Sequence, residues 1–193
     1  MNFLRKFLLI SSVIVVSLAV YFQIFVNREH THDLPIVRKI PEFSLIDSKG
    51  QEFTSRVLKG KVWVSDFIFT TCAGICPVMS KHLAGIYESY QGNRHIQFVS
   101  FSVNPGYDSP DVLASYAQKY HADPKQWHFL TGKIELIEKI MTEDFKLGSG
   151  GEPAMHSGHF VLVDKQGRIR GYYDGTQTDS VEHLKHDIKI LLE

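Results

Sequence analysis

The sequence has few cysteines and no net charge. The chain has only two cysteines among 193 residues, so cysteine alone would leave a metal site incomplete. Its 21 basic and 21 acidic side chains cancel, which removes the charge excess that favours nucleic acid as a partner. Internal repeats and low-complexity blocks are also absent. With 44% apolar residues, the chain has enough material for one globular domain.

One long uncharged run stands near the N-terminus. It extends from Phe7 to Val26, and twenty residues at about 1.5 Å each can cross the roughly 30 Å hydrocarbon core of a bilayer. Neither an Ala-x-Ala cleavage site nor a lipobox cysteine follows it, so we expect an uncleaved anchor. Because Arg5 and Lys6 precede the run, the positive-inside rule predicts a single pass through the cell membrane. Residues 1–6 would then be cytoplasmic and the C-terminal domain extracytoplasmic.

Strand and helix patterns alternate along the rest of the chain. Residues 27–42 are polar with two prolines and are expected to link the anchor to a domain formed by residues 43–193. Turn residues predict one hairpin around 48–50 and another around 164–167. The predicted strands are 61–69, 95–103, 127–130, 159–163 and 168–173, and the predicted helices are 78–90, 111–120, 133–145 and 179–193. This order implies an α/β fold with a central mixed sheet, helices on both faces and its last two strands antiparallel.

Both cysteines lie on a predicted strand-to-helix turn. Pro77 suits the first position of a helix, which places Cys76 at or beside the N-cap. Unpaired N–H groups and the helix dipole favour an anion there, so at least one thiol should have a pKa below its ordinary value of about 8.5. Gly74 allows a turn that brings Cys72 and Cys76 close together. The pair can therefore act as a dithiol, as a disulfide, or as two soft ligands of Cu(I) that need a third ligand from elsewhere in the fold.

Two other roles for the cysteines are less favoured. A structural disulfide would close only a short loop and so would constrain the unfolded chain little. Peroxidase chemistry of the peroxiredoxin type usually requires a Pro-x3-Thr-x2-Cys loop, which the sequence lacks. Metal binding and thiol–disulfide exchange are therefore the two favoured functions.

Several motifs together resemble the Sco/SenC family over about residues 40–190. They are Asp66 to Thr70 followed by Cys72-x3-Cys76-Pro77, Ser102 to Pro105 with Asp108 and Pro110, Trp127 to Gly132, and Met155-His156 ahead of Phe160 to Val163 with Gly167. Members of this family are membrane-anchored, thioredoxin-like proteins that bind copper and help to assemble the CuA centre of cytochrome c oxidase. The resemblance implies a thioredoxin-like fold behind one N-terminal transmembrane helix, and a metallochaperone function.

The resemblance also implies a site. By position, the family's copper ligands fall on Cys72, Cys76 and His156, which would hold Cu(I), or Cu(II) with an extra ligand. The implied partner is the oxidase subunit that carries the CuA site, with other copper carriers or thiol reductants as further partners. The alternative is a thiol–disulfide reductase that uses Cys72 and Cys76 as its catalytic redox pair. Asn104 stands where the family usually has an acid, and residues 73–75 replace its frequent Pro-Asp-Val or Pro-Asp-Ile.

Few of the remaining histidines and methionines are candidate copper ligands. His159, three residues after His156, is the nearest competitor. Met79 is expected in the core because of its helical spacing, whereas Met155 is a second soft donor whose role stays open. Solvated side chains are expected for His30, His32, His82, His95, His121, His128, His183 and His186.

Two aspartates have alternative roles. Asp66 interrupts a buried strand pattern, where it is either a hydrogen-bonded structural acid, which we favour, or a group that handles protons for the nearby thiols. Asp108 is expected in a turn or at a helix cap.

Overall fold

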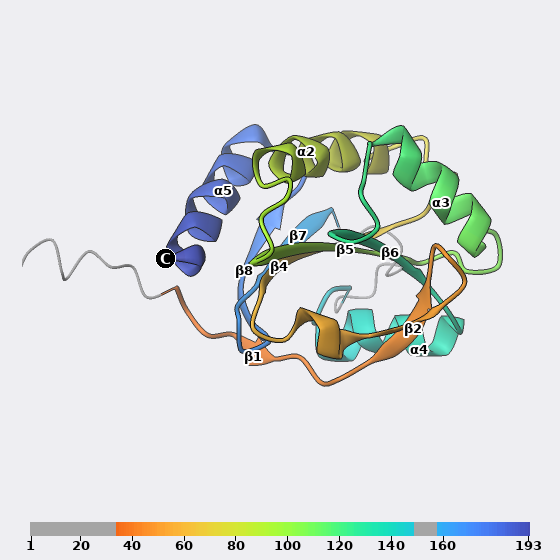
Figure 1. Ribbon diagram of the computed structural model, residues 1–193, viewed down its shortest axis with the longest axis horizontal. Helices are drawn as coiled ribbons and strands as arrows, with labels where there is room; N and C mark the ends of the chain where they lie inside the picture. The colour runs from red at the N-terminus through yellow and green to blue at the C-terminus, as the bar shows by residue number, and fades with distance from the viewer. Residues whose placement is uncertain (1–33, 149–157) are drawn as a thin grey trace, which may run out of the picture. The chain divides into compact units, whose positions relative to one another are not determined.

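The computed structural model describes residues 34–148 and 158–193 (Figure 1). The predicted membrane span, residues 7–26, lies outside these ranges, and so do Met155 and His156. Within the described ranges, no helix is long and apolar enough to cross a bilayer.

A mixed eight-stranded sheet forms the centre of the domain, with strand order β1-β8-β7-β4-β5-β6-β2-β3. Strands β4, β5 and β6 are parallel to one another, and β7 and β8 are antiparallel. Both predicted hairpins are confirmed, and Gly50 and Gly167 supply the positive φ angles of their turns. The strands are β1 Arg38–Lys39, β2 Ser44–Asp47, β3 Glu52–Thr54, β4 Val62–Ile68, β5 Ile96–Ser102, β6 Trp127–Thr131, β7 His159–Val163 and β8 Arg168–Asp174.

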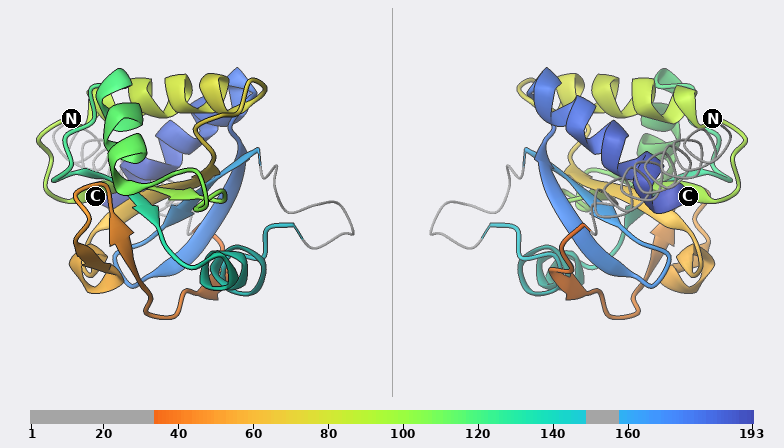
Figure 2. Two further views of the ribbon diagram at one scale, coloured as in Figure 1. Left: turned by 90° about the vertical axis from the view of Figure 1, so that its right-hand side faces the viewer. Right: turned by 90° about the vertical axis from the view of Figure 1, so that its left-hand side faces the viewer.

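Helices cover both faces of the sheet, as predicted. Figures 1 and 2 show α2, α3 and α5 on one face and α4 on the other. The predicted helix 133–145 consists of α4 and a following turn of π-helix. The helical elements are the 3-10 turn η1 Ser55–Leu58, α2 Cys76–Ser89, α3 Pro110–Lys119, α4 Ile134–Lys139, the π-turn Ile140–Asp144 and α5 Thr178–Leu192.

Strand β4 contributes side chains to a separate buried cluster on each face. Val62, Val64 and Ile68 pack with the helices α2, α3 and α5, whereas Trp63 and Phe67 pack on the side of α4. Such a strand is covered on both faces, which explains its nearly continuous apolar sequence. Because successive side chains point to opposite faces, position 66 lies on the same face as α2.

The domain begins earlier than predicted. Strand β1 lies within the range expected to be a linker, and it pairs with β8 through Arg38 opposite Ile169. The next residue, Ile40, is buried and donates its backbone N–H to the Gly167 carbonyl at 2.9 Å. This pairing joins residues far apart in the sequence, which a local pattern of polar residues and prolines does not reveal.

Candidate functional site

The cysteine loop connects the carboxyl end of β4 to the start of α2, as predicted. Ile75 is the N-cap of α2, Cys76 is its first residue, and Pro77 follows within the first turn. At the start of the loop, the Cys72 N–H donates to the Phe69 carbonyl at 3.1 Å. The loop therefore folds back on itself and holds Cys72 against the end of the helix.

The two thiols are free and differ in exposure. Cys76 is buried, with 4% of its surface exposed, whereas Cys72 is half-buried. The Cys76 thiol and the backbone N–H groups of residues 74–76 hydrogen-bond the Cys72 sulfur. Burial by itself would raise the pKa of Cys72, but these hydrogen bonds outweigh it and lower the pKa below its ordinary value. The predicted activated thiol is thus Cys72 in the loop.

Cys76 behaves in the opposite way, although it stands at the helix start. Burial raises the pKa of its thiol well above the ordinary value, and the hydrogen bond from the Phe69 backbone offsets only part of this. The hydrogen bond with Cys72 and the negative charges of Cys72 and Asp66 raise the pKa further. The pKa values of the two thiols are therefore shifted in opposite directions, lower for Cys72 and higher for Cys76, which donates its proton in a hydrogen bond to Cys72.

A fully buried carboxylate lies on the α2 side of the sheet. Asp66 has no exposed surface, and neither of its carboxylate oxygens has a well-formed hydrogen bond with the described residues. Burial raises the pKa of Asp66 to about 7, and Ser100 offsets only part of the effect. The Ser100 hydroxyl already accepts a 2.9 Å hydrogen bond from Trp127. The geometry among the described residues therefore does not show the well hydrogen-bonded structural acid that we favoured, and the proton-handling role stays a hypothesis.

Asp108 anchors the cysteine loop, a role that the sequence did not predict. Its buried carboxylate accepts hydrogen bonds from the Thr70 backbone N–H at 3.2 Å, from the Thr70 hydroxyl at 2.5 Å and from the Ser102 hydroxyl at 2.6 Å. Of the two expected roles, the helix cap is wrong, because the N-cap of α3 is Ser109, whereas Asp108 does end a turn, in which its N–H donates to the Asn104 carbonyl at 2.9 Å. A carboxylate with three donors ties the loop after β4 to the loop after β5.

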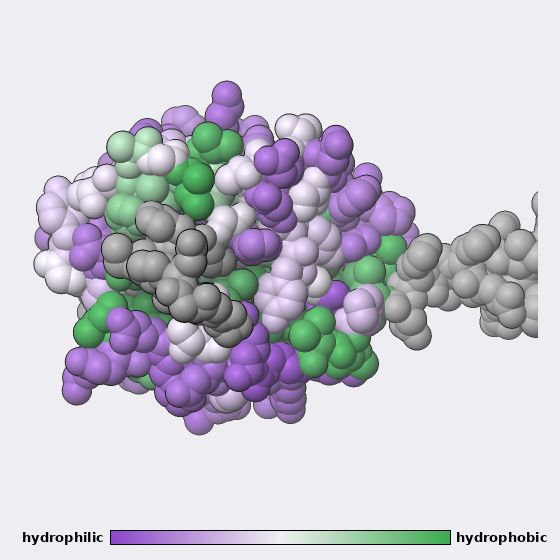
Figure 3. Space-filling model, turned by 180° about the vertical axis from the view of Figure 1, so that it is seen from behind, coloured by the Kyte–Doolittle hydropathy of each residue, from purple (hydrophilic) through white to green (hydrophobic). Residues whose placement is uncertain are grey.

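The cysteine loop and the loop after β5 carry no charge of their own. Neither residues 69–80 nor residues 101–107 include a charged side chain. Val78 and Tyr107, one in each segment, are 44% and 57% exposed. Figure 3 shows the face seen from behind Figure 1, where patches of hydrophobic residues lie among hydrophilic ones.

A family model described as SCO1/SenC matches residues 35–193. The chain belongs to the SCO1/SenC family. The SCO1 protein homolog of Bacillus subtilis (strain 168) is 30% identical over 161 residues, which are 80% of this chain and 83% of that protein. A putative copper-binding protein of Stutzerimonas stutzeri is 29% identical over 185 residues, 89% of this chain and 88% of that protein.

The same fold is found in a solved structure of BsSco. That protein is described as a member of the Sco family of cytochrome c oxidase assembly proteins in which a disulfide switch was identified. It has a TM-score of 0.70 and 30% identity, and the match covers 80% of this chain and 94% of that one. The central mixed sheet with flanking helices is thus the architecture of a solved Sco protein.

The described histidines of this SCO1/SenC protein have ordinary partners or lie on the surface. His82 Nδ1 is 2.8 Å from the Gly175 carbonyl, and His128 Nε2 is 2.9 Å from the Gln97 amide oxygen. His159 is exposed, at the start of β7. Residues 34–148 and 158–193 contain no group of three His, Cys, Asp or Glu side chains that could hold a metal ion. His30, His32 and His156 lie outside these ranges, so the predicted third ligand stays a prediction.

Met79 is fully buried in the core, as predicted. Asn104, at the position where the family usually has an acid, acts through its backbone: its carbonyl accepts the N–H groups of Tyr107 and Asp108 at 3.0 and 2.9 Å. No local pattern signals the Asp108 anchor, because Thr70 is 38 positions away.

Proposed function

We propose that this protein is a copper metallochaperone that binds copper through Cys72, Cys76 and His156 and assists assembly of the CuA centre of cytochrome c oxidase. The observation that carries this proposal is the pair of free thiols in hydrogen-bond contact at the start of α2, with hydrogen bonds that lower the pKa of Cys72. Two thiolates and an imidazole are a donor set that suits Cu(I). The family, and the relatives named for copper binding and for oxidase assembly, support the same cargo and recipient.

The difference between the two thiols suggests an order of events in copper uptake. Cys72 would bind the ion first, because its sulfur is half-buried rather than fully buried and its pKa is lowered. Cys76 must then lose its proton, since only a thiolate is a strong ligand. Asp66 is the buried carboxylate whose charge acts on Cys76; coordination of the cation would lower the pKa of the Cys76 thiol, and Asp66, with a pKa of about 7, would then take up the proton.

The second candidate function is thiol–disulfide reduction. The Cys72 thiolate would attack a partner's disulfide, forming a mixed disulfide and releasing one partner thiolate. Cys76, after losing its proton, would attack the Cys72 sulfur, so that the partner leaves with two reduced cysteines and this protein keeps a disulfide. The unequal pKa values of the pair favour this candidate, as does the disulfide switch reported for BsSco. A separate thiol reductant would have to restore the dithiol.

For the location we propose the single-pass arrangement. Residues 7–26 would anchor the protein in the cell membrane, with residues 1–6 cytoplasmic and the folded domain extracytoplasmic. Cys72 would then be on the membrane face where the oxidase subunit is proposed to receive copper.

The test is a set of matched variants of the full chain in a mild detergent. We expect one Cu(I) ion per chain, tightly bound by the parent and by His159→Ala, and a loss of affinity of at least about tenfold in Cys72→Ser, Cys76→Ser and His156→Ala. Copper transfer is measured with the apo form of a CuA-bearing subunit. If His156→Ala keeps the parent affinity, the proposed ligand set is wrong. If no variant binds or transfers copper differently from the parent, while both cysteine variants lose disulfide reduction, the second function replaces the first.

A further inference from the structure

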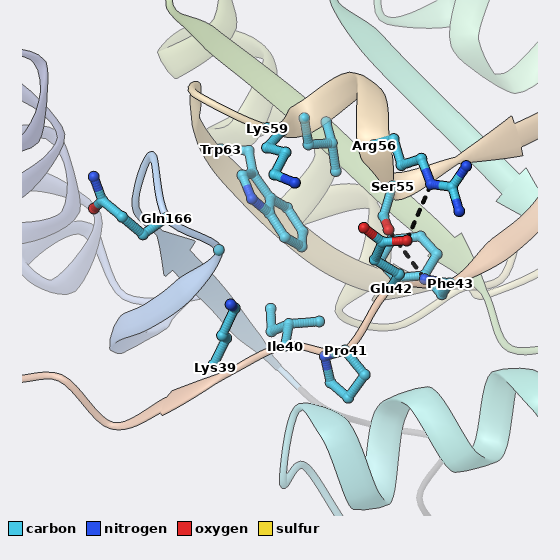
Figure 4. Close-up of a pocket in the computed structure, with 12 residues that line it drawn as sticks. Lys39, Ile40, Pro41, Glu42, Phe43, Ser55, Arg56, Lys59, Trp63 and Gln166 are labelled. Carbon is cyan, nitrogen blue, oxygen red and sulfur yellow. Dashed lines mark hydrogen bonds and ion pairs between the residues drawn. The ribbon is translucent and has the colours of Figure 1, made fainter.

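A cavity of about 430 Å³ lies between the start of β4, the β7–β8 turn and the segment that follows β1 (Figure 4). The side chains of Ile40, Phe43, Leu58 and Trp63 form its buried apolar lining. Pockets of this size with an apolar wall and few polar groups are typical of sites for small ligands.

This cavity is separate from the cysteine site. Trp63 lies near the amino end of β4, and the cysteine loop leaves from the carboxyl end. The five residue-to-residue steps along the strand from Trp63 to Ile68 span about 16 Å. Trp63 also belongs to the buried cluster on the α4 side of the sheet, whereas Cys76 belongs to the cluster on the α2 side. A ligand in the cavity would therefore not touch the sulfurs.

The rim of the cavity has an excess of positive charge. Lys39, Arg56 and Lys59 line it together with a single acid, Glu42. Glu42 already pairs with Arg56 at 3.0 Å. Lys39 and Lys59 have no ion pair within the described part of the chain, and Figure 4 shows both side chains turned toward the space beside Trp63. Two positive charges are thus left without a partner next to an apolar wall.

The indole N–H of Trp63 is a third donor without a partner. Trp63 is 97% buried, since only 3% of its surface is exposed, yet no described residue accepts its N–H. The other tryptophan differs, because Trp127 Nε1 donates to Ser100 at 2.9 Å. Among the described residues, the side-chain polar atoms that are both sealed from solvent and unpaired belong to Ser65 and Asp66. The Trp63 N–H must therefore be open to solvent, and the cavity is the space that this side chain borders.

We propose that this cavity binds an amphipathic anion, a carboxylate or phosphate group on a short aliphatic chain. The oxyanion would accept the Trp63 N–H and pair with Lys39 and Lys59, and the aliphatic part would cover Ile40, Phe43 and Leu58. Two sources share this chemistry: a free fatty acid, and the headgroup with the first methylene groups of an anionic phospholipid. The proposal does not depend on copper binding.

Tryptophan fluorescence can test the proposal in the full chain. The chain has two tryptophans, so a Trp127→Phe background leaves Trp63 as the only reporter. This protein is placed in phosphatidylcholine nanodiscs and titrated with hexanoate and, separately, with hexanol. A second preparation in phosphatidylglycerol nanodiscs receives no added ligand. Lys39→Gln/Lys59→Gln is compared with Lys133→Gln/Lys189→Gln, which removes the same charge from exposed positions outside the cavity.

We expect hexanoate to shift Trp63 emission in a saturable way, and the Lys39→Gln/Lys59→Gln pair to raise the half-saturating concentration about fivefold or more, with no change in the control pair. A shift of Trp63 emission in phosphatidylglycerol discs that is lost in the Lys39→Gln/Lys59→Gln variant identifies the lipid as a source. A response to hexanoate but not to phosphatidylglycerol identifies the free amphiphile. An equal response to hexanol and hexanoate would overturn the assignment of an anion. The proposal would also be overturned if the Lys39→Gln/Lys59→Gln variant had the same hexanoate titration as the parent, or if neither hexanoate nor phosphatidylglycerol shifted the emission.

Discussion

The hydroxyl of Thr70 donates a 2.5 Å hydrogen bond to the buried carboxylate of Asp108, 38 positions further along the chain. The same carboxylate also accepts the Thr70 backbone N–H and the Ser102 hydroxyl. Thr70 stands two residues before Cys72, so this contact fixes the point from which the cysteine loop leaves the sheet. The position of the reactive sulfur thus depends on an acid that touches neither cysteine.

We expect Thr70→Val to loosen this loop. Valine keeps the shape of threonine but removes one donor to a buried carboxylate, which should lower the free energy of unfolding by about 1–3 kcal/mol. Urea denaturation measures this change, and the alkylation rate of Cys72 reports the position of its sulfur. The matched control is Ser109→Ala, which should cost about 1 kcal/mol through the loss of a helix cap and leave Cys72 unaffected. Equal effects of both variants on the Cys72 rate would contradict the anchoring role.

The two thiols should react at different rates. At neutral pH, iodoacetamide should modify Cys72 at least about tenfold faster than Cys76, because only the Cys72 pKa is lowered. Mass spectrometry of quenched samples measures both rates. Cys76→Ser should keep most of the Cys72 rate, since serine can still donate to the sulfur, whereas Cys76→Ala should slow it by about twofold or more. Faster modification of Cys76 in the parent would show that the activated thiol was wrongly assigned.

Local patterns in the sequence predicted the strand, the turn and the helix around the cysteines. Pro77 marked the helix start, and alternating apolar runs marked the hairpins, because both signals depend on neighbouring residues. The choice between Cys72 and Cys76 could not be made in this way. It depends on which sulfur is buried and on where the N–H groups of residues 74–76 converge.

Long-range contacts were the other part that the sequence did not reveal. The pairing of Arg38 with Ile169 brought part of the predicted linker into the sheet, and no local pattern carries that information. The same applies to Asp108, whose partner Thr70 lies on another loop. The third copper ligand, His156, was inferred from a family resemblance, and it stays a prediction because it lies outside the described residues.

His128 should make the protein less stable in mild acid. Burial lowers the pKa of this imidazole from 6.5 to about 4, so the stability it contributes is present above pH 6.5 and is lost as the pH falls toward 4. In His128→Gln, the difference in unfolding free energy from the parent should shrink by about 2–3 kcal/mol between pH 7.5 and pH 4. Gln118→Ala, an exposed substitution that removes no titratable group, provides the control, for which this difference should stay constant. A constant difference for His128→Gln as well would contradict the burial argument.

Asp66 should make the protein less stable as the pH rises, which is the opposite of the effect of His128, over an overlapping pH range. Burial raises the pKa of its carboxyl from 3.8 to about 7, so the folded state is favoured below pH 3.8 and loses this advantage as the pH rises to 7. Because Asp66→Asn removes the titration, the variant should gain about 4 kcal/mol relative to the parent between pH 3.8 and pH 8. Urea denaturation across this range measures the change, and the difference between variant and parent separates Asp66 from His128.

Ser65→Ala is the matched control for Asp66→Asn. The Ser65 hydroxyl is also buried without a hydrogen-bond partner among the described residues, yet it does not titrate, so its effect on stability should not vary with pH. If Asp66→Asn also has a pH-independent effect, the carboxyl has the same pKa in the folded and unfolded chains, near 3.8, and is too weak a base near neutral pH to take up a proton from Cys76. If the expected slope is found, Asp66→Asn should also slow the second, Cys76-dependent step of disulfide exchange near neutral pH, while the first attack by Cys72 keeps its rate.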